Sequence, residues 1–138
     1  MSRRYVDSNV FFYAKIMDRE YGKSCSHILR KITTGELEAS TSALIPIEVA
    51  NAMRKFGLEA EVVAEIRAIF SLGIDVCAID PSDTQEAAEI FSGSSINPYD
   101  CLHAAVMKRM GLNEIISADK EFDKIDWIAR VDPNSMTK

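Results

Sequence analysis

The stretch Arg4-Tyr5-Val6-Asp7-Ser8-Asn9-Val10-Phe11 joins a short apolar run to a segment with helical spacing, and an aspartate stands where the two meet. Tyr5-Val6 is typical of a short buried strand, and the residues from Asn9 to Met17 are typical of a helix with an apolar face. In an open α/β sheet, binding sites form at the carboxyl ends of the strands. The pattern therefore predicts that Asp7 lies at such an edge.

Three more acidic residues occupy the same kind of position further along the chain. Glu48 and Asp100 each lie near the start of a predicted helix, and Asp119 directly follows an apolar run. Carboxylates gathered at one edge without buried cations repel one another strongly. Because Mg²⁺ and Mn²⁺ prefer hard oxygen ligands, a divalent cation at this edge would relieve the repulsion.

Strands and helices alternate along the chain. We predict strands at 5–6, 39–41, 74–79, 114–117 and 127–131, and helices at 9–17, 23–32, 43–56, 59–72, 83–91 and 97–110. The strand at 39–41 is expected to be short or edge-like, whereas the run from Ile74 to Ile79 is the clearest strand. This alternation implies a parallel sheet covered by helices on both sides.

Length and composition fit one globular unit. A chain of 138 residues is expected to form a single domain over 1–138, with a core from about 4 to 131 and a polar tail at 132–138. No apolar run approaches the ~20 residues of a membrane span, and no signal-peptide core follows the N-terminus. We therefore expect no membrane association and a cytoplasmic location. The three cysteines lack metal-ligand spacing and are expected to be small buried hydrophobic residues: Cys25, Cys77 and Cys101.

The net charge bears on the substrate. A formal charge of −5 counts against nucleic acid, because phosphate binding usually leaves a basic footprint. The objection is only partial, since acidic metal ligands contribute to this total and bound cations would cancel them locally. The candidates for phosphate contacts are Arg3, Arg4, Lys15, Arg54, Lys55 and Lys120.

Each acidic residue also has a structural explanation, because acids are favoured at helix N-termini. Asp7 and Asp119 could cap the helical segments that follow them, and Asp100 could form a capping arrangement with Asn97. Glu48 is harder to explain in this way, because it lies at the edge of an apolar stripe with no basic residue one turn away. A partly buried charge needs a partner, so Glu48 requires either a distant residue or a metal ion.

Four segments resemble the motifs of the PIN domain family. They are Val6 to Ala14, Ile47 to Arg54, Asp100 to Ala105 followed by Gly111-Leu112, and Ile116 to Asp123. The motifs occur in the family's order and the match runs from about 4 to 131, which makes the set far more specific than any single motif. The resemblance implies a compact three-layer α/β/α sandwich with a central, mainly parallel sheet.

The resemblance also implies an activity. Similar proteins are divalent-metal-dependent endoribonucleases, often the toxin of a toxin–antitoxin pair as in the VapC group, so RNA is the implied substrate and an antitoxin protein an implied partner. The implied catalytic residues, which would hold one or two Mg²⁺ or Mn²⁺ ions, are Asp7, Glu48, Asp100 and Asp119. Asn9 and Ser117 would tune the site, and Asp123 would be an outer metal ligand.

The chain departs from the usual motif in the surroundings of Asp100. Cys101 and His103 are less typical neighbours of this residue, and Ser117 stands where threonine is commoner. His103 follows Asp100 by one turn and is either a proton carrier or, as we favour, a histidine satisfied by a local hydrogen bond, since a metal ion can activate water without it. His27 has no acidic motif around it and is expected to be structural.

Two other functions fit parts of the sequence. A phosphatase of the haloacid-dehalogenase type also begins with an aspartate after a first strand, but Asp7-Ser8-Asn9 lacks the second aspartate that this chemistry uses. A PIN-fold module that binds RNA or regulates without cleaving is the stronger alternative. A homodimer is also expected, because the helices carry more apolar residues than one inward face needs, among them Phe11, Phe12, Val62, Val63, Phe70 and Leu72.

Overall fold

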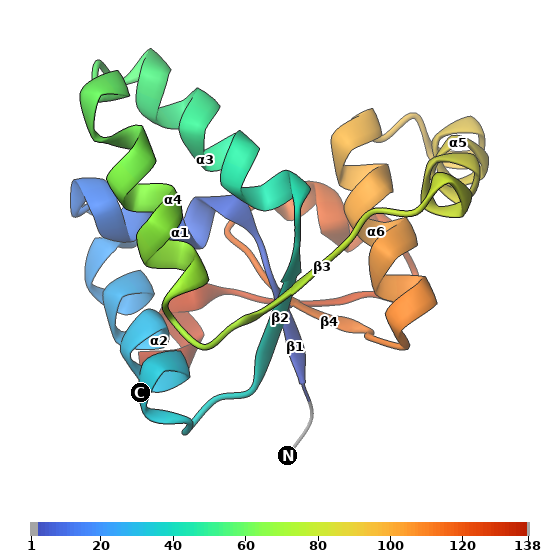
Figure 1. The fold of residues 1–138 in the computed structure, drawn as a ribbon. Coiled ribbons are helices and arrows are strands. Elements are labelled where there is room, and N and C mark those ends of the chain that lie inside the picture. The colour runs from blue at the N-terminus through green and yellow to red at the C-terminus, as the bar shows by residue number, and fades with distance from the viewer. Residues whose placement is uncertain (1–2, 138) are drawn as a thin grey trace.

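The protein, seen in a computed structural model that describes residues 3–137, is built around a central sheet (Figure 1). The strands are β1 (Arg4–Val6), β2 (Ala39–Ser42), β3 (Asp75–Cys77), β4 (Glu114–Ile116) and β5 (Ala129–Val131). Their order across the sheet is β3-β2-β1-β4-β5, and the pairings between neighbours are all parallel. The expected parallel sheet is confirmed.

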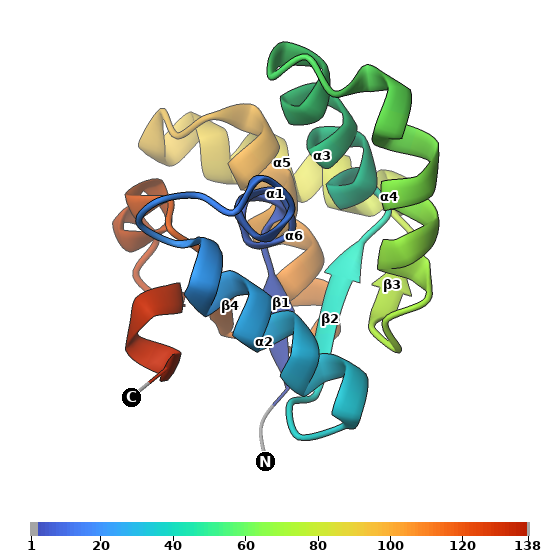
Figure 2. The same cartoon turned by 90° about the vertical axis from the view of Figure 1, so that its left-hand side faces the viewer.

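Helices cover both faces of this sheet. The α-helices are α1 (Ser8–Ile16), α2 (Gly22–Thr34), α3 (Leu44–Lys55), α4 (Val62–Phe70), α5 (Pro81–Ser94) and α6 (Pro98–Met110), and the 3₁₀ helices are η1 (Glu59–Glu61), η2 (Lys120–Lys124) and η3 (Pro133–Thr137). Helices α1 to α4 lie on one side and α5 and α6 on the other (Figure 1, and Figure 2 from the side). The three-layer α/β/α sandwich is confirmed.

Each face of the sheet has its own apolar core. Val6 of β1 and Ile116 of β4 pack into the core with α1 to α4, whereas Tyr5 and Ile115 pack into the core with α5 and α6. The alternation arises because successive side chains of a strand point to opposite faces. Both central strands are thereby held from two sides, which fixes the position of their carboxyl ends.

The position of β2 differs from the edge-like placement that its sequence suggests. The strand is short, as expected, but it lies between β3 and β1 and all its residues are buried. Its hydroxyl groups tolerate burial because they are hydrogen-bonded: Thr41 Oγ1 donates to the Val6 carbonyl at 2.9 Å, and Ser42 Oγ accepts from the Tyr5 hydroxyl at 2.9 Å. On this side of the sheet the edge strand is β3, the strand with the clearest sequence signal.

One of two neighbouring helix boundaries matches expectation and the other differs. Asn97 caps α6 as predicted, its Oδ1 accepting from the Tyr99 N–H at 2.8 Å. Helix α5, however, continues to Ser94, so that most of the loop expected after Phe91 is helical. The reason is that Ser94 Oγ donates to the Ile90 carbonyl at 2.7 Å, which satisfies a carbonyl in the last turn.

The segment expected as a polar tail forms η3 instead. Ser24 Oγ donates to Asn134 Oδ1 at 2.6 Å, and Met136 packs against the core next to α1 and α2. Of the cysteines, Cys25 and Cys101 are buried as expected, while Cys77 on the edge strand is partly exposed. Within residues 3–137, no helix is long and apolar enough to cross a membrane.

Candidate metal centre

Asp7 lies at the carboxyl end of the central strand β1, where the sequence places it. It is the N-cap of α1, accepting the Ser8 N–H at 2.8 Å, and only 4% of its surface is exposed. Its other oxygen accepts hydrogen bonds from Ser117 Oγ at 2.6 Å and from Asn9 Nδ2 at 3.2 Å. The cap interpretation and the edge position therefore both hold for this residue.

Asn9 and Ser117 join the ends of β1 and β4. Asn9 Nδ2 donates to Ser117 Oγ at 3.1 Å, and Asn9 Oδ1 accepts the Ala118 N–H at 3.2 Å. Ser117 is fully buried, and its Oγ also accepts the Asp119 N–H at 2.9 Å. This network fixes the Asp7 carboxyl and connects the start of the Asp119 turn to it.

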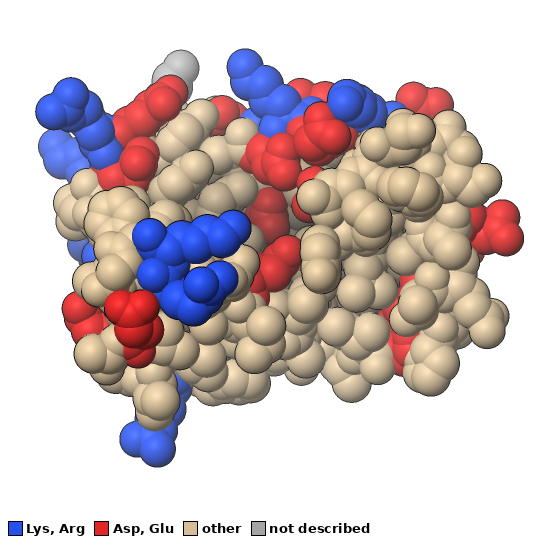
Figure 3. Space-filling view, turned by 90° about the horizontal axis from the view of Figure 1, so that it is seen from above, with Lys and Arg blue, Asp and Glu red and all other residues tan. Residues whose placement is uncertain are grey.

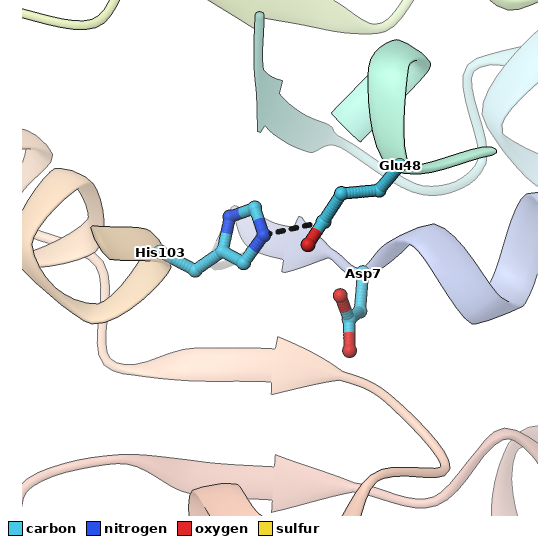
Figure 4. A group of neighbouring side chains, drawn as sticks. All are labelled: Asp7, Glu48 and His103. Atoms are coloured by element: carbon cyan, nitrogen blue, oxygen red, sulfur yellow. Dashed lines mark hydrogen bonds and ion pairs between the residues drawn. The ribbon is translucent and has the colours of Figure 1, made fainter. Parts of the chain in front are cut away.

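Glu48 reaches the same edge from α3, and its distant partner is His103 of α6. The distance from His103 Nε2 to Glu48 Oε1 is 2.6 Å, and Figure 4 shows the imidazole facing the Glu48 carboxyl with Asp7 beside them. The other ring nitrogen, Nδ1, lies 2.7 Å from the Tyr5 hydroxyl, which contacts Ser42 in turn. His103 is therefore satisfied by hydrogen bonds, but these bonds reach other elements and are not local.

Asp7, Glu48 and His103 together form a potential metal-binding group. One ligand atom from each residue lies within 4.8 Å of the others. Sequence reasoning noticed His103 only through its spacing from Asp100 and did not expect it beside Glu48. The one available signal was that spacing, because residues three apart on a helix share a face, and Asp100 and His103 do so on α6.

Asp100 and Asp119 face each other at the same edge. Asp119 caps η2 by accepting the Glu121 N–H at 3.0 Å, while Asp100 lies in the first turn of α6 and is hydrogen-bonded to Asp119. Burial raises the pKa of Asp100 to about 8, with the negative charges of Asp119 and Asp7 acting in the same direction. A carboxyl group whose pKa is raised by burial and by neighbouring carboxylates is typical of a site with too little positive charge.

The electrostatics of the neighbouring groups agree. Burial raises the pKa of Asp7, against the opposing effects of His103 and of the hydrogen bonds from Ser117 and Ser8. Burial alone would lower the pKa of His103, but its hydrogen bond to Glu48 and the charges of Glu48 and Asp7 outweigh burial and raise it. The pKa values of Asp7, Asp100 and His103 are therefore all raised, and a divalent cation would compensate the negative charge of the ionised carboxylates.

Asp123 has a different environment. Arg130 Nε donates to Asp123 Oδ1 at 3.0 Å and Arg130 Nη2 donates to its Oδ2 at 3.3 Å, and the Asp123 side chain is about half exposed, at 51%. The structure thus engages the expected outer ligand in an ion pair, and the group formed by Asp7, Glu48 and His103 does not include it.

The carboxylates lie in a hollow of the molecular surface. Figure 3 looks onto the carboxyl edge of the sheet and shows acidic side chains gathered in a central depression, with basic side chains on its flanks. A groove of about 580 Å³ continues from Glu48 along α3 and is also lined by Ser8 and Tyr99. We call this the α3 groove. A donor set of carboxylate oxygens with one imidazole nitrogen, open to such a groove, suits Mn²⁺ or Mg²⁺ acting on a bound substrate.

Comparisons with known proteins agree with this geometry. The family model described as PIN domain matches residues 4–128. A search among curated proteins gave no match. Among solved structures, VapC20 of Mycobacterium tuberculosis, described as a sarcin-ricin loop cleaving toxin, is similar with a TM-score of 0.73 and 15% identity over 88% of this chain and 93% of that one.

Two complexes are similar as well. VapBC2 of Rickettsia felis, bound to a promoter DNA fragment, has a TM-score of 0.71 and 12% identity over 94% of this chain and 98% of that one. A toxin–antitoxin complex from Klebsiella pneumoniae has a TM-score of 0.65 and 14% identity over 94% of this chain and 97% of that one. At these identities the likeness demonstrates a shared fold.

Proposed function

This chain belongs to the PIN domain family, and from that premise we propose that it is a divalent-metal-dependent endoribonuclease that cleaves phosphodiester bonds in RNA. PIN domains are generally nucleases. The observation that carries the proposal is the convergence of carboxylates from separate segments at one edge of the sheet, where burial, together with the charges of Asp119 and Asp7, raises the pKa of Asp100 to about 8.

Asp7, Glu48, Asp100 and Asp119 would hold one or two Mg²⁺ or Mn²⁺ ions. A bound metal ion supplies an activated water near neutral pH and stabilises charge on a phosphoryl group. Hydrogen bonds within the chain hold two of these carboxyl groups in place: Asn9 and Ser117 fix Asp7, and His103 holds Glu48. Metal binding would favour the deprotonated form of Asp100, because metal ligands must be deprotonated.

Cleavage of RNA tests this proposal directly. We expect unstructured or looped RNA to be cut in Mn²⁺ or Mg²⁺ and left intact in EDTA. Asp7→Asn should reduce cleavage by more than the roughly 10–100-fold typical of changes outside the direct metal ligands. Asp126→Asn, which makes the same carboxylate-to-amide change at an exposed aspartate, is the matched control and should cleave normally. Cleavage that persists in EDTA would contradict the proposal.

One observation favours the alternative of a PIN-fold module that binds RNA without cleaving it. His103 already supplies Glu48 with a hydrogen-bond donor at 2.6 Å, so this carboxylate is compensated within the chain. The same assay distinguishes the two functions. Retention of RNA on the protein with no cleavage in any divalent metal would support the binding module and reject the nuclease.

We further propose that the protein is the toxin of a toxin–antitoxin pair. The similar structures include a toxin and two complexes of this kind, which supports an antitoxin protein as partner. Co-expression with the product of an adjacent small gene should yield a stable complex that no longer cleaves RNA. Separate elution of the two proteins with full RNA cleavage would contradict this proposal.

We also propose a homodimer, but fewer of the apolar residues named from the sequence are exposed than expected. Phe11 is buried in the core, whereas Val63 and Phe70 on α4 are 62% and 57% exposed. Phe56 lies exposed at the end of the neighbouring helix α3. Exposed apolar patches of this kind are typical of interfaces. Light scattering should therefore give the mass of a dimer that Val63→Glu reduces to a monomer, and a monomeric wild-type protein would refute it.

A further inference from the structure

The α3 groove combines features that the carboxylate group alone does not explain. Its walls come from α3, α1 and α6, the helices that carry Glu48, Asp7 and Asp100. Ser8 and Tyr99, which line the groove, directly adjoin Asp7 and Asp100 in the sequence. If the cleaved phosphate of an RNA chain lies at the carboxylates, the adjacent nucleotide of that chain therefore lies next to this groove.

Tyr99 presents an exposed ring in this groove from a rigid position. It is the second residue of α6, and its N–H is held by the Asn97 side chain at 2.8 Å. Its surface is 60% exposed, and its ring pairs with no other aromatic ring in the described part of the chain. Ile47, which is 61% exposed, lines the groove from α3. A fixed aromatic ring beside an apolar wall is a platform on which a flat group can stack.

Lys55 adds a positive charge to the same groove. It is exposed, and among residues 3–137 it has no ion-pair partner, in contrast to Lys15, whose Nζ lies 2.7 Å from Glu61. A lysine in this situation remains able to neutralise a phosphate. The groove thus offers a stacking surface and a free cation beside the carboxylates.

We infer that the α3 groove binds one unpaired nucleotide of the RNA, next to the phosphate that is cleaved, with its base stacked on Tyr99. This inference rests on the proposed ribonuclease function. A volume of about 580 Å³ falls within the ~300–1,000 Å³ of small-ligand sites and suits a single nucleotide. A base held in a duplex cannot stack on a side chain, so the site selects single-stranded RNA.

Binding and cleavage measurements separate this subsite from the nuclease proposal. Fluorescence anisotropy with a short labelled single-stranded RNA is measured in an Asp119→Asn background, so that cleavage does not interfere. We expect Tyr99→Ala to weaken binding by about tenfold or more, and Tyr99→Phe to bind within about twofold of the parent, because the phenyl ring still stacks. The matched control is Phe91→Ala, which removes an exposed aromatic ring that lies outside both the groove and the proposed dimer surface.

An abasic scan of the RNA identifies the stacked base. Removing one base at each position in turn should weaken binding at one position, and that loss should disappear in Tyr99→Ala, because the two changes remove the same contact. Equal affinity of Tyr99→Ala and its parent, independent losses in the scan, or no measurable RNA binding would each overturn the inference.

The two proposals fail in different ways. If the wild-type protein cleaves RNA with metal and Tyr99→Ala does not change the RNA affinity, the nuclease proposal is supported and the subsite is rejected. If RNA binding depends on Tyr99 but the wild-type protein cleaves no RNA, the subsite is supported and the nuclease proposal is rejected. A Tyr99→Ala variant with normal RNA affinity but a lower mass in light scattering would assign the ring to a protein interface and reject the subsite.

Discussion

Two buried aspartates of this protein have opposite environments. Asp83 of α5 is 2% exposed, and Arg109 contacts both of its oxygens at 2.8 and 2.9 Å. Asp7 is 4% exposed, yet in the described chain its hydrogen-bond donors are a backbone N–H, a hydroxyl and an amide, with no lysine or arginine. The hydrogen bonds of Arg109 lower the pKa of Asp83, whereas burial raises that of Asp7.

The difference between the two aspartates is whether a lysine or arginine pairs with the buried carboxylate. A buried carboxylate with its own arginine is structurally complete, because the ion pair offsets the cost of burial. Within residues 3–137, no lysine or arginine forms an ion pair with Asp7, Asp100 or Asp119, and burial raises the pKa values of Asp7 and Asp100. The Asp83–Arg109 pair thus needs no further cation, whereas the proposed metal centre would supply one to the carboxylates at the carboxyl ends of the strands.

The largest expected effect comes from removing the internal cation. Arg109→Met leaves the buried Asp83 carboxylate without its arginine and should clearly lower the free energy of unfolding. RNA cleavage per folded molecule should not change, because this pair lies outside the site. Denaturant unfolding measures the loss, and a loss below about 1 kcal/mol would mean that Asp83 is compensated in another way.

The pH dependence of stability should differ between the two regions. The folded pKa of Asp100 is raised to about 8, so the folded protein binds more protons than the unfolded chain between about pH 4 and 8. In EDTA, stability should therefore fall on the order of 1–3 kcal/mol as the pH rises through this window. The folded pKa of Asp83 is lowered, so its contribution is lost only as the pH falls below its unfolded value near 4.

Melts at several pH values, with Asp100→Asn for comparison, measure the first of these changes. The Asp100→Asn variant should show a flatter decline between pH 5 and 8, because it lacks the group that titrates. An unchanged slope in this variant would assign the pH dependence to other residues, such as His103, whose pKa is also raised.

A smaller effect is expected at His103, which orients Glu48. His103→Gln should weaken Mn²⁺ binding by about 10–100-fold, in the range of changes to residues that hold metal ligands. Titration calorimetry measures the affinity without reference to cleavage. Tyr5→Phe is the companion variant: it removes only the hydroxyl that contacts Nδ1, and should change the affinity less. Tighter metal binding by His103→Gln would show that the histidine competes with the metal.

The sequence predicted the edge of the sheet but not the contacts within it. Asp7 could be placed because a strand, an acid and a helix follow one another directly. The Glu48–His103 contact could not, since the two residues lie 55 positions apart and no helical or strand period relates them. The central position of β2 was missed because Ser40 to Ser42 read as polar, while their burial depends on hydrogen bonds to neighbouring elements such as those of Thr41 and Ser42.

Thermal melts in EDTA and in excess Mn²⁺ test most directly whether the carboxylates at the carboxyl ends of the strands bind a divalent cation. At a hundredfold excess over Kd, the metal should stabilise the wild type by about 2.7 kcal/mol. Asp100→Asn should be more stable than wild type in EDTA at neutral pH, because the amide is neutral without the proton that the buried carboxyl must take up on folding. The variant should also gain much less from Mn²⁺. Asp126→Asn should match wild type in both. Equal metal-induced shifts in wild type and Asp100→Asn would contradict the proposed metal centre.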